Sequence, residues 1–439
     1  DSDEDYARFF AATDALRQRL VDALAGRAEP VLLNAAGRAR SGLMLSEVSP
    51  ADADAQAIVR ADGSAAYLLS VSDVPALSLA RLDAHLHSVP DVLSVSETHL
   101  ENDRLSIRFD ALGRMTSIFD RQNSREILPE GGLGNQLQAF RDMPAQYDAW
   151  DIDADFEDQP YAIEHLADVA VVERGPLRAA IRFEWHYERS RIVQIVSLAA
   201  GAAQVEIDCF IDWHEHNTLL KTAFPVAVNA ASVDAEIQFG HVRRASHRNT
   251  SWDSARFECS MQRWVDVSEP GFGVALLNDC KYGYDAKGSM VRLTLLRSPT
   301  YPWTEADQGE HRFRYALLVH GGEKLAVHEA AEDFNLPLRL VHGRGEASGF
   351  EAPLVTIETE GVSLEAIKRA EDADGVIIRL WETGGRRQQA SLRLHPCFVR
   401  AELVDLLEEG GQPLELADNH LTLAFKPFEI VTLRLRGSL

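Results

Sequence analysis

Alternation of apolar and polar residues, repeated in one short segment after another, is the feature that most constrains the fold of this chain. Between residues 100 and 340 the pattern has a period of two, as at 105–109 and 205–211. Strand side chains point alternately to two faces, so each segment predicts a half-buried strand. We find no convincing helix within this stretch. So many strands in about 240 residues favour a large two-sheet sandwich.

The first residues, 1–26, predict a helix instead. Tyr6, Phe9 and Leu20 belong to a set of apolar residues spaced three or four apart, and Gly26 stands where a helix is expected to end. Such a helix has an apolar stripe and nothing local against which to bury it. We therefore expect it to be the last helix of a helical domain that lies mostly upstream.

Two smaller strand-rich stretches flank the main body. Short apolar runs around an Asp62-Gly63 turn predict a β-hairpin, and a further strand series occupies 354–435. The expected fold class is therefore mainly β, with a short N-terminal helix. The expected domains are the terminal helix at 1–26, a small β domain plus linker at 27–98, a large β domain at 99–345 and a small C-terminal β-sandwich at 346–439.

Composition argues against several classes of partner. The chain has 68 acidic and 44 basic residues, a net charge of −24, and such a field repels polyanions. We therefore expect no nucleic-acid and no membrane partner, whereas a neutral sugar is compatible. No signal-peptide pattern and no apolar run of about 18 residues is present. The four cysteines lack metal or redox spacing, so we expect buried free thiols and a cytoplasmic location.

Metal and nucleophile chemistry has little support in the sequence. The best metal-like spacing is Asp208, Asp212, His214 and His216, which could share one face of a strand. We favour a packing role for these residues. His214 with Glu215 is also a candidate acid–base pair, but the sequence does not show whether the two converge. Neither a Gly-x-Ser-x-Gly motif nor a phosphate-binding Gly-Lys-Ser/Thr loop occurs.

Two clusters mix aromatic and polar residues, at 135–153 and 278–311. Sugars are bound by aromatic faces together with carboxylates, amides and imidazoles. Both clusters fall on predicted turns between strands, where binding sites are often carried. The alternative is that their aromatic residues pack at the sandwich edge with polar tips in water. We assign no catalytic residue and no metal ligand, and the candidate substrate-binding residues are Asp142, Tyr147, Trp150, Asp151, Asp307 and His311.

An ordered set of short motifs runs over nearly the whole chain, and it includes Leu100-Glu-Asn102, Asp142-x-Pro144, Asp148-Ala-Trp-Asp151, Lys281-Tyr-Gly-Tyr-Asp285, Leu295-Leu-Arg297, Asp307-x-Gly309-x-His311 and Lys426-Pro-Phe-Glu-Ile430. No single motif is diagnostic, but their ordered sum is specific. In that order they resemble the α-mannosidases of glycoside hydrolase family 38. The departures are Ala35, where the family usually has Pro, and Trp303-Thr304, where it more usually has Asp-Pro.

This resemblance implies a supersandwich of the galactose-mutarotase type for the large β domain. It implies a parent enzyme that hydrolyses terminal α-mannosides with retention, using a divalent metal, expected to be zinc. The family holds its metal through a His-x-Asp, and none of the fifteen histidines here precedes an Asp by two positions. We therefore expect this chain to hold no cofactor, to serve as scaffold and pocket wall, and to be inactive without the upstream catalytic domain.

Two other functions stay open on the sequence alone. One is a free-standing carbohydrate-binding protein, and the other is a mutarotase-like sugar epimerase or lyase, which would need a converging acid–base pair. The expected partners are an α-mannoside or oligosaccharide and the upstream domain. A homo-oligomer is a further open expectation.

Overall fold

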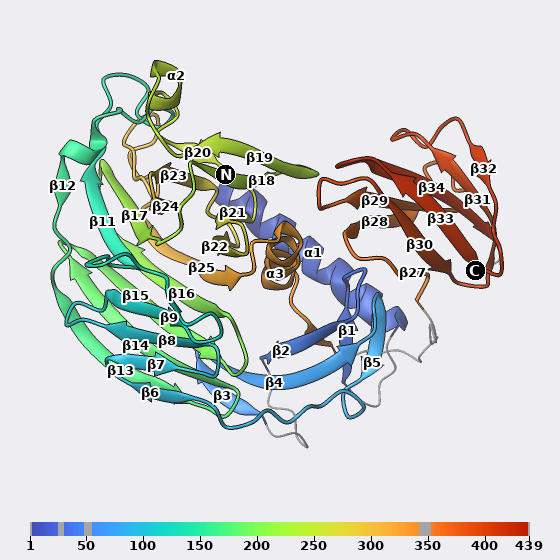
Figure 1. Ribbon diagram of the computed structural model, residues 1–439, viewed down its shortest axis with the longest axis horizontal. Helices are drawn as coiled ribbons and strands as arrows, with labels where there is room; N and C mark the ends of the chain where they lie inside the picture. The colour runs from blue at the N-terminus through green and yellow to red at the C-terminus, as the bar shows by residue number, and fades with distance from the viewer. Residues whose placement is uncertain (1, 25–29, 48–54, 342–352, 438–439) are drawn as a thin grey trace. The chain divides into compact units, whose positions relative to one another are not determined.

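The computed structural model describes residues 2–24, 30–47, 55–341 and 353–437 (Figure 1). Most of the described chain is β-strand, with a helix at the N-terminus, so the expected mainly β fold class is confirmed. The chain divides into two compact units. The first comprises residues 1–54, 68–88 and 336–439, and the second comprises 55–67 and 89–335.

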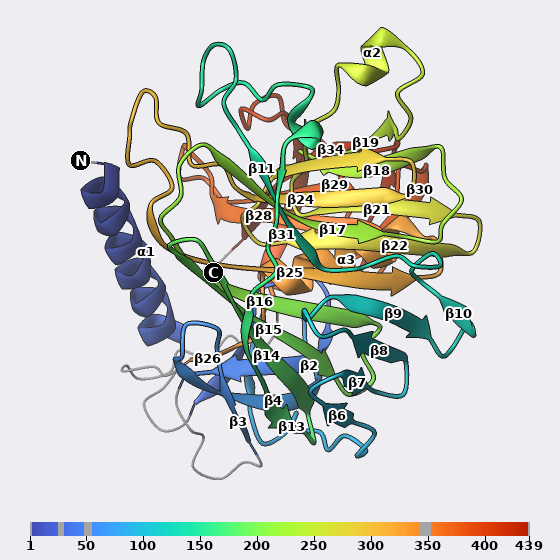
Figure 2. The ribbon, with the colours of Figure 1, turned by 90° about the vertical axis from the view of Figure 1, so that its left-hand side faces the viewer.

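Three antiparallel sheets of the second unit enclose one apolar core. Figure 1 shows strands β13 to β16 of the nine-stranded sheet side by side, and Figure 2 shows strands β17 and β24 of the six-stranded sheet. The nine-stranded sheet has the order β13 (Leu166–Arg174), β14 (Arg178–Tyr187), β15 (Ser190–Ala199), β16 (Gln204–Trp213), β25 (Gly309–His320), β22 (Phe272–Asn278), β21 (Trp264–Glu269), β18 (Ser232–Ile237) and β19 (Gly240–Ala245). The six-stranded sheet has the order β12 (Pro160–Tyr161), β11 (Gln136–Arg141), β17 (Thr218–Pro225), β24 (Met290–Leu296), β23 (Gly283–Lys287) and β20 (Cys259–Ser260). The five-stranded sheet has the order β10 (Arg125–Glu126), β9 (Met115–Asp120), β8 (Leu105–Phe109), β7 (His99–Glu101) and β6 (Ser94–Ser96).

Strand β16 shows how the alternating pattern becomes a core. Val205, Ile207 and Ile211 are fully buried in the main core, while the residues between them are polar or lie toward the other face. The strand pairs with β15 on one side and with β25 on the other. Its pairing with β25 runs from Gln204↔Leu318 to Trp213↔Gly309. The strand expected at 205–211 is therefore present, and its register buries the apolar set.

Our expectation of no helix between residues 100 and 340 is wrong. Helix α3, Lys324–Asn335, follows β25 and packs on the nine-stranded sheet. Its buried residues Val327, Ala331 and Phe334 recur at helical spacing. The stripe is only about two turns long and lies among charged residues, so it gives a weak periodic signal. A shorter helix, α2 (Ser251–Ser254), and a 3₁₀ turn, η1 (Phe156–Asp158), were also missed.

The first unit contains helix α1, Ser2–Leu24, with the exposed apolar side chains of Tyr6, Phe9 and Phe10. The helix expected at 1–26 is therefore present, although its expected stop at Gly26 lies outside the described residues, as does the expected domain boundary at 345. No helix in the described ranges is long and apolar enough to cross a membrane.

The first unit also contains a sheet and a sandwich. Residues 55–67, which belong to the second unit, include strand β3 (Gln56–Val59) and the predicted turn, where Gly63 has a φ of 86° and donates its N–H to the Arg60 carbonyl at 2.9 Å. The chain then continues into the sheet β4 (Ala65–Val74), β2 (Arg40–Ser46), β26 (Arg339–Val341), β1 (Val31–Asn34) and β5 (Ser78–Arg81). The C-terminal sandwich has a three-stranded sheet, β27 (Val355–Ile357), β30 (Gln388–Leu394) and β33 (His420–Phe425). Its five-stranded sheet is β28 (Val362–Arg369), β29 (Val376–Glu382), β34 (Ile430–Gly437), β31 (Phe398–Val404) and β32 (Gln412–Leu414). The two sheets share an apolar core, so the β-sandwich character expected here is confirmed.

The cysteines only partly follow expectation. All four are free, and Cys209 is buried, as expected. Cys259 and Cys397 are half-buried, and Cys280 is exposed. The expectation of buried thiols is therefore wrong for Cys280, which lies just after strand β22 rather than inside a strand.

A buried lysine lies on the face of the six-stranded sheet that is turned away from the main core. Lys221 is 0% exposed, and its Nζ lies 2.5 Å from Glu258 Oε2 and 2.9 Å from Asp285 Oδ2. It also donates to Thr294 Oγ1 at 2.7 Å. Removing Lys221 takes one cationic partner from Asp285, which is buried and also pairs with Arg292, and from Glu258, which is half-buried.

We predict that Lys221→Met lowers the free energy of unfolding by about 3–5 kcal/mol. The matched control is Lys287→Met, because Lys287 is 53% exposed and pairs with Glu157 at 2.7 Å, and such pairs contribute less than about 1 kcal/mol. Urea unfolding of both variants, followed by tryptophan fluorescence, measures the difference. Equal losses would contradict the structural role assigned to Lys221.

Candidate functional site

Three loops are attached to neighbouring strand ends on one side of the six-stranded sheet. Arg141 at the end of β11 pairs with Thr218 at the start of β17, and Leu296 at the end of β24 pairs with Leu220. The ends of these antiparallel strands therefore lie together. We call the three loops, residues 142–155, 214–217 and 297–308, the Arg297 loop cluster. Five of the six candidate residues lie on these loops, and His311 lies at the start of β25 beside them.

Arg297 lies at the centre of the cluster. Its Nε donates to Asp142 Oδ2 at 2.8 Å. Its terminal nitrogens donate to three carbonyls of the turn at 148–151: those of Asp148 at 3.1 Å, of Ala149 at 3.4 Å, and of Asp151. A guanidinium has five N–H donors in a rigid plane, so it can hold a loop in a way that lysine cannot.

Two carboxylates fasten the loops to each other. Asp148 Oδ2 accepts the N–H groups of Thr300 and Tyr301 at 2.6 and 3.0 Å. Asp307 Oδ2 accepts the N–H groups of Arg297 and Ser298 at 3.3 and 3.0 Å. Both carboxylates therefore satisfy backbone donors across or within the loops, which is how irregular segments can be held rigid.

Asp142 is the buried acid of the cluster. It is 2% exposed, and burial raises its pKa to about 6 against the opposing effect of Arg297, while the charges of Asp148 and Asp153 add to the rise. Its Oδ1 has no hydrogen-bond partner. It lines a cavity of ≈ 30 Å³ together with Asp153 and Gln159, which is room for about one water molecule.

The His311 ring contacts the cluster at a backbone carbonyl. Its Nε2 lies 2.9 Å from the Asp307 carbonyl oxygen. That contact is a hydrogen bond when Nε2 carries the proton. Burial lowers the pKa of His311, which favours the neutral ring at neutral pH.

Exposed aromatic side chains surround this framework. Tyr147 is 63% exposed and Trp150 is 65% exposed, and both lie on the turn held by Arg297. Tyr301 and Trp303, on the loop joined by Asp148, are 65% and 57% exposed. The alternative that Trp150 merely packs at the sandwich edge does not fit this exposure. Exposed aromatic faces on fixed loops are suited to binding apolar faces of a ligand.

The structure therefore brings all six candidate residues together, but in different positions. Asp142, Asp307 and His311 contact the loop framework, whereas Tyr147, Trp150 and Asp151 present exposed side chains. Arg297 and Asp148 are not among the six candidates. Both stand in the quoted motifs, so a signal existed, but nothing local shows which backbone groups they would reach.

The metal-like spacing does not form a site. Asp208 accepts the Ala61 N–H at 2.9 Å, and Asp212 pairs with His214 at 2.9 Å. Glu215 accepts from Ser190 Oγ at 2.8 Å, so its carboxylate is engaged away from the His214 ring. Within the ranges that the structure covers, no three His, Cys, Asp or Glu side chains gather as metal ligands.

We predict a pH-dependent stability difference between the wild type and Asp142→Asn. The folded pKa of about 6 exceeds the ordinary 3.8, so between these values the native state retains a proton that the unfolded state has lost. The wild type therefore loses stability relative to the variant as pH rises from about 4 to 6, on the order of 3 kcal/mol. Urea unfolding over this range measures the difference. A difference that stays constant with pH would contradict the prediction.

Comparisons with known proteins agree with this architecture. The family model described as "Glycosyl hydrolases family 38 C-terminal domain" matches residues 100–305. The model described as "Glycosyl hydrolases family 38 C-terminal beta sandwich domain" matches residues 361–433. An α-mannosidase crystal structure from Enterococcus faecalis V583 has a TM-score of 0.72 at 17% identity, covering 97% of this chain and 58% of that one. That likeness shows the fold.

Curated relatives match at higher identity. Alpha-mannosidase 2C1 of Homo sapiens is 37% identical over 388 residues, 84% of this chain and 37% of that protein. Alpha-mannosidase G of Dictyostelium discoideum is 31% identical over 355 residues, 76% of this chain and 32% of that protein. The chain thus spans about a third of the length of these relatives. It belongs to glycosyl hydrolase family 38 and corresponds to the C-terminal, β-rich portion of its members.

Proposed function

We propose that the protein hydrolyses terminal α-mannosides with retention, and that the Arg297 loop cluster forms one wall of its substrate pocket. The observation that carries the proposal is the set of exposed aromatic side chains on loops fixed by Arg297. The curated relatives, all α-mannosidases, support the substrate class. Aromatic faces packing on sugar C–H groups suit that substrate.

The residues of the wall divide into two groups. Asp142, Arg297 and Asp307 are positioning residues, because their polar atoms are directed to the loops themselves. Tyr147 and Trp150 are the contact residues, since their side chains are exposed on the held turn. Asp151 joins the contact group through its exposed carboxylate, which can accept from sugar hydroxyls.

Retaining hydrolysis needs two carboxylates, or a carboxylate and a Lewis-acid metal, at the scissile bond. The described residues gather no such metal-ligand group. Following the resemblance to family 38, we assign the divalent metal, expected to be zinc, and the nucleophile to an upstream catalytic domain. The chain described here is then scaffold and pocket wall, and it is inactive without that catalytic part.

A second candidate function is carbohydrate binding without hydrolysis. The same observation favours it, because exposed Tyr147 and Trp150 on a rigid turn would hold a sugar whether or not catalysis follows. A sugar that binds the isolated chain without turnover is compatible with both functions. The two are separated by activity of a protein that includes the catalytic part.

We predict no turnover of a chromogenic α-mannoside by the purified chain, with zinc or cobalt added or with a chelator present. Release of the chromophore measured by absorbance is the test. Metal-dependent turnover would contradict the proposal, and Asp208, Asp212, His214 and His216 would be the first residues to substitute.

We predict that Trp150→Ala, in an active form of the protein that includes this chain, raises KM about tenfold and leaves kcat nearly unchanged. The matched control is Trp252→Ala, because Trp252 is 76% exposed on α2, outside the cluster. Arg297→Met should lower kcat and raise KM together, since the turn that it holds would move. Unchanged kinetics in both cluster variants would contradict the assignment of the wall.

A further inference from the structure

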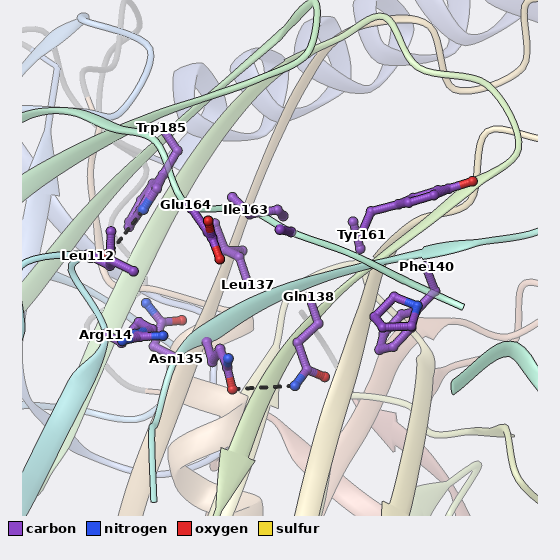
Figure 3. Close-up of a pocket in the computed structure, with 14 residues that line it drawn as sticks. Leu112, Arg114, Asn135, Leu137, Gln138, Phe140, Tyr161, Ile163, Glu164 and Trp185 are labelled. Atoms are coloured by element: carbon purple, nitrogen blue, oxygen red, sulfur yellow. Dashed lines mark hydrogen bonds between the residues drawn. The ribbon is translucent and has the colours of Figure 1, made fainter. Parts of the chain in front are cut away.

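A second concave site lies beside strand β11, apart from the Arg297 loop cluster. It is a cavity of ≈ 200 Å³, lined by residues 135–140, by residues 160–164, by Trp185 of β14 and by the turn between β8 and β9 (Figure 3). The volume is below the ~300 Å³ at which pockets for drug-sized ligands begin. The cavity therefore suits one small ring rather than a chain of rings.

The cavity exists because two strands diverge. Strand β12 pairs with only two residues of β11, Ala139↔Tyr161 and Phe140↔Pro160. Beyond them, residues 162–164 leave the ladder. Leu137 lies two positions before Ala139, so its backbone N–H and C=O point to the same side of β11 as those of Ala139. No backbone bond from Leu137 to residues 162–164 is present in this fully described region, so these groups are open to a ligand.

The walls of the cavity are fixed before any ligand arrives. Asn135 donates to Gln194 Oε1 at 2.8 Å and accepts from Tyr315 Oη at 2.6 Å and Thr222 Oγ1 at 3.0 Å. All four residues are buried, so the start of β11 is held rigidly. On the opposite wall, Trp185 Nε1 donates to the Leu112 carbonyl at 3.0 Å. A preformed cavity binds without the entropy cost of ordering its walls.

The lining presents both apolar faces and unused polar atoms. Tyr161 is 42% exposed, and Trp185 and Phe140 complete the apolar part. Gln138 Oε1 is enclosed and has no hydrogen-bond partner, while Gln138 Nε2 has only a long contact of 3.4 Å to Gln136 Oε1. Figure 3 shows Gln138 and Tyr161 among the side chains that surround the cavity. An enclosed acceptor without a donor is costly unless a ligand or water supplies one.

The charges around the cavity indicate an uncharged ligand. The guanidinium of Arg114 pairs with Asp110 at 2.7 Å, so its charge is neutralised locally. Glu164, on the opposite side, is exposed to solvent. The other polar lining groups are carboxamides, backbone amides and the Tyr161 hydroxyl. Together they need both donors and acceptors from the ligand. Hydroxyl groups supply both.

We propose that this cavity is a binding site for a single neutral sugar ring or a cyclic polyol of similar size. Gln138 Oε1 and the free edge of Leu137 bind its hydroxyl groups, and Tyr161 packs on its C–H face. The site does not depend on the proposed function of the Arg297 loop cluster. The ring is either a free small molecule or the terminal residue of a longer glycan, because the cavity holds one ring in both cases.

The test is isothermal titration of the purified chain with methyl α-D-mannoside, methyl α-D-glucoside and myo-inositol, each up to about 50 mM, a range that detects millimolar affinity. At least one of these should bind. Gln138→Leu keeps the side-chain volume but removes the acceptor, and should weaken binding about tenfold or more. Tyr161→Ala, at a partly exposed position, should weaken it similarly. Thermal unfolding of both variants confirms that they fold.

A control variant lies outside both sites. Trp252→Ala, at a position 76% exposed on α2, should leave the binding constant unchanged. A linear manno-oligosaccharide titrated in parallel shows whether a terminal ring or a free ring is preferred, and either form must lose affinity in Gln138→Leu. Absence of binding by every probe would overturn the proposal. Binding that Gln138→Leu and Tyr161→Ala leave intact would overturn it as well.

Discussion

The contact between Arg297 and Asp142 is the interaction on which the candidate site depends. The N–H groups of Arg297 are shared between one carboxylate and the carbonyls of the 148–151 turn. Asp142 is nearly fully buried, so its charge is stable only beside that cation. The pair therefore holds the turn that presents Trp150, and the exposed aromatic residues owe their positions to it.

The framework beneath these loops is also held by polar groups inside the sandwich. Asn135 precedes a strand of the six-stranded sheet, and Gln194 and Tyr315 belong to the nine-stranded sheet, yet the three side chains are hydrogen-bonded to one another. Apolar packing alone tolerates small shifts between sheets, whereas a fully satisfied polar network allows one arrangement. The same network fixes one wall of the cavity beside β11.

The parts of the fold that follow a local rule were predictable. The strand at 205–211 and the hairpin at Asp62-Gly63 follow from alternation and from a glycine at positive φ. Helix α3 was harder to predict, because its short apolar stripe can be recognised as a buried face only once the sheet that covers it is known. In the same way, the position of Lys221 in a strand does not show that three polar partners from other segments surround it.

The sequence by itself determined the strand-rich fold class, the family and the six residues that gather at one sheet edge, because periodicity and ordered motifs are properties of the chain read in order. Tertiary structure decided what each of those residues does. Asp142 and Trp150 are equal candidates in the sequence, yet one is buried against Arg297 and the other is exposed. Arg297 lies about 150 positions from its partners, and only the antiparallel pairing of β11, β17 and β24 places them side by side.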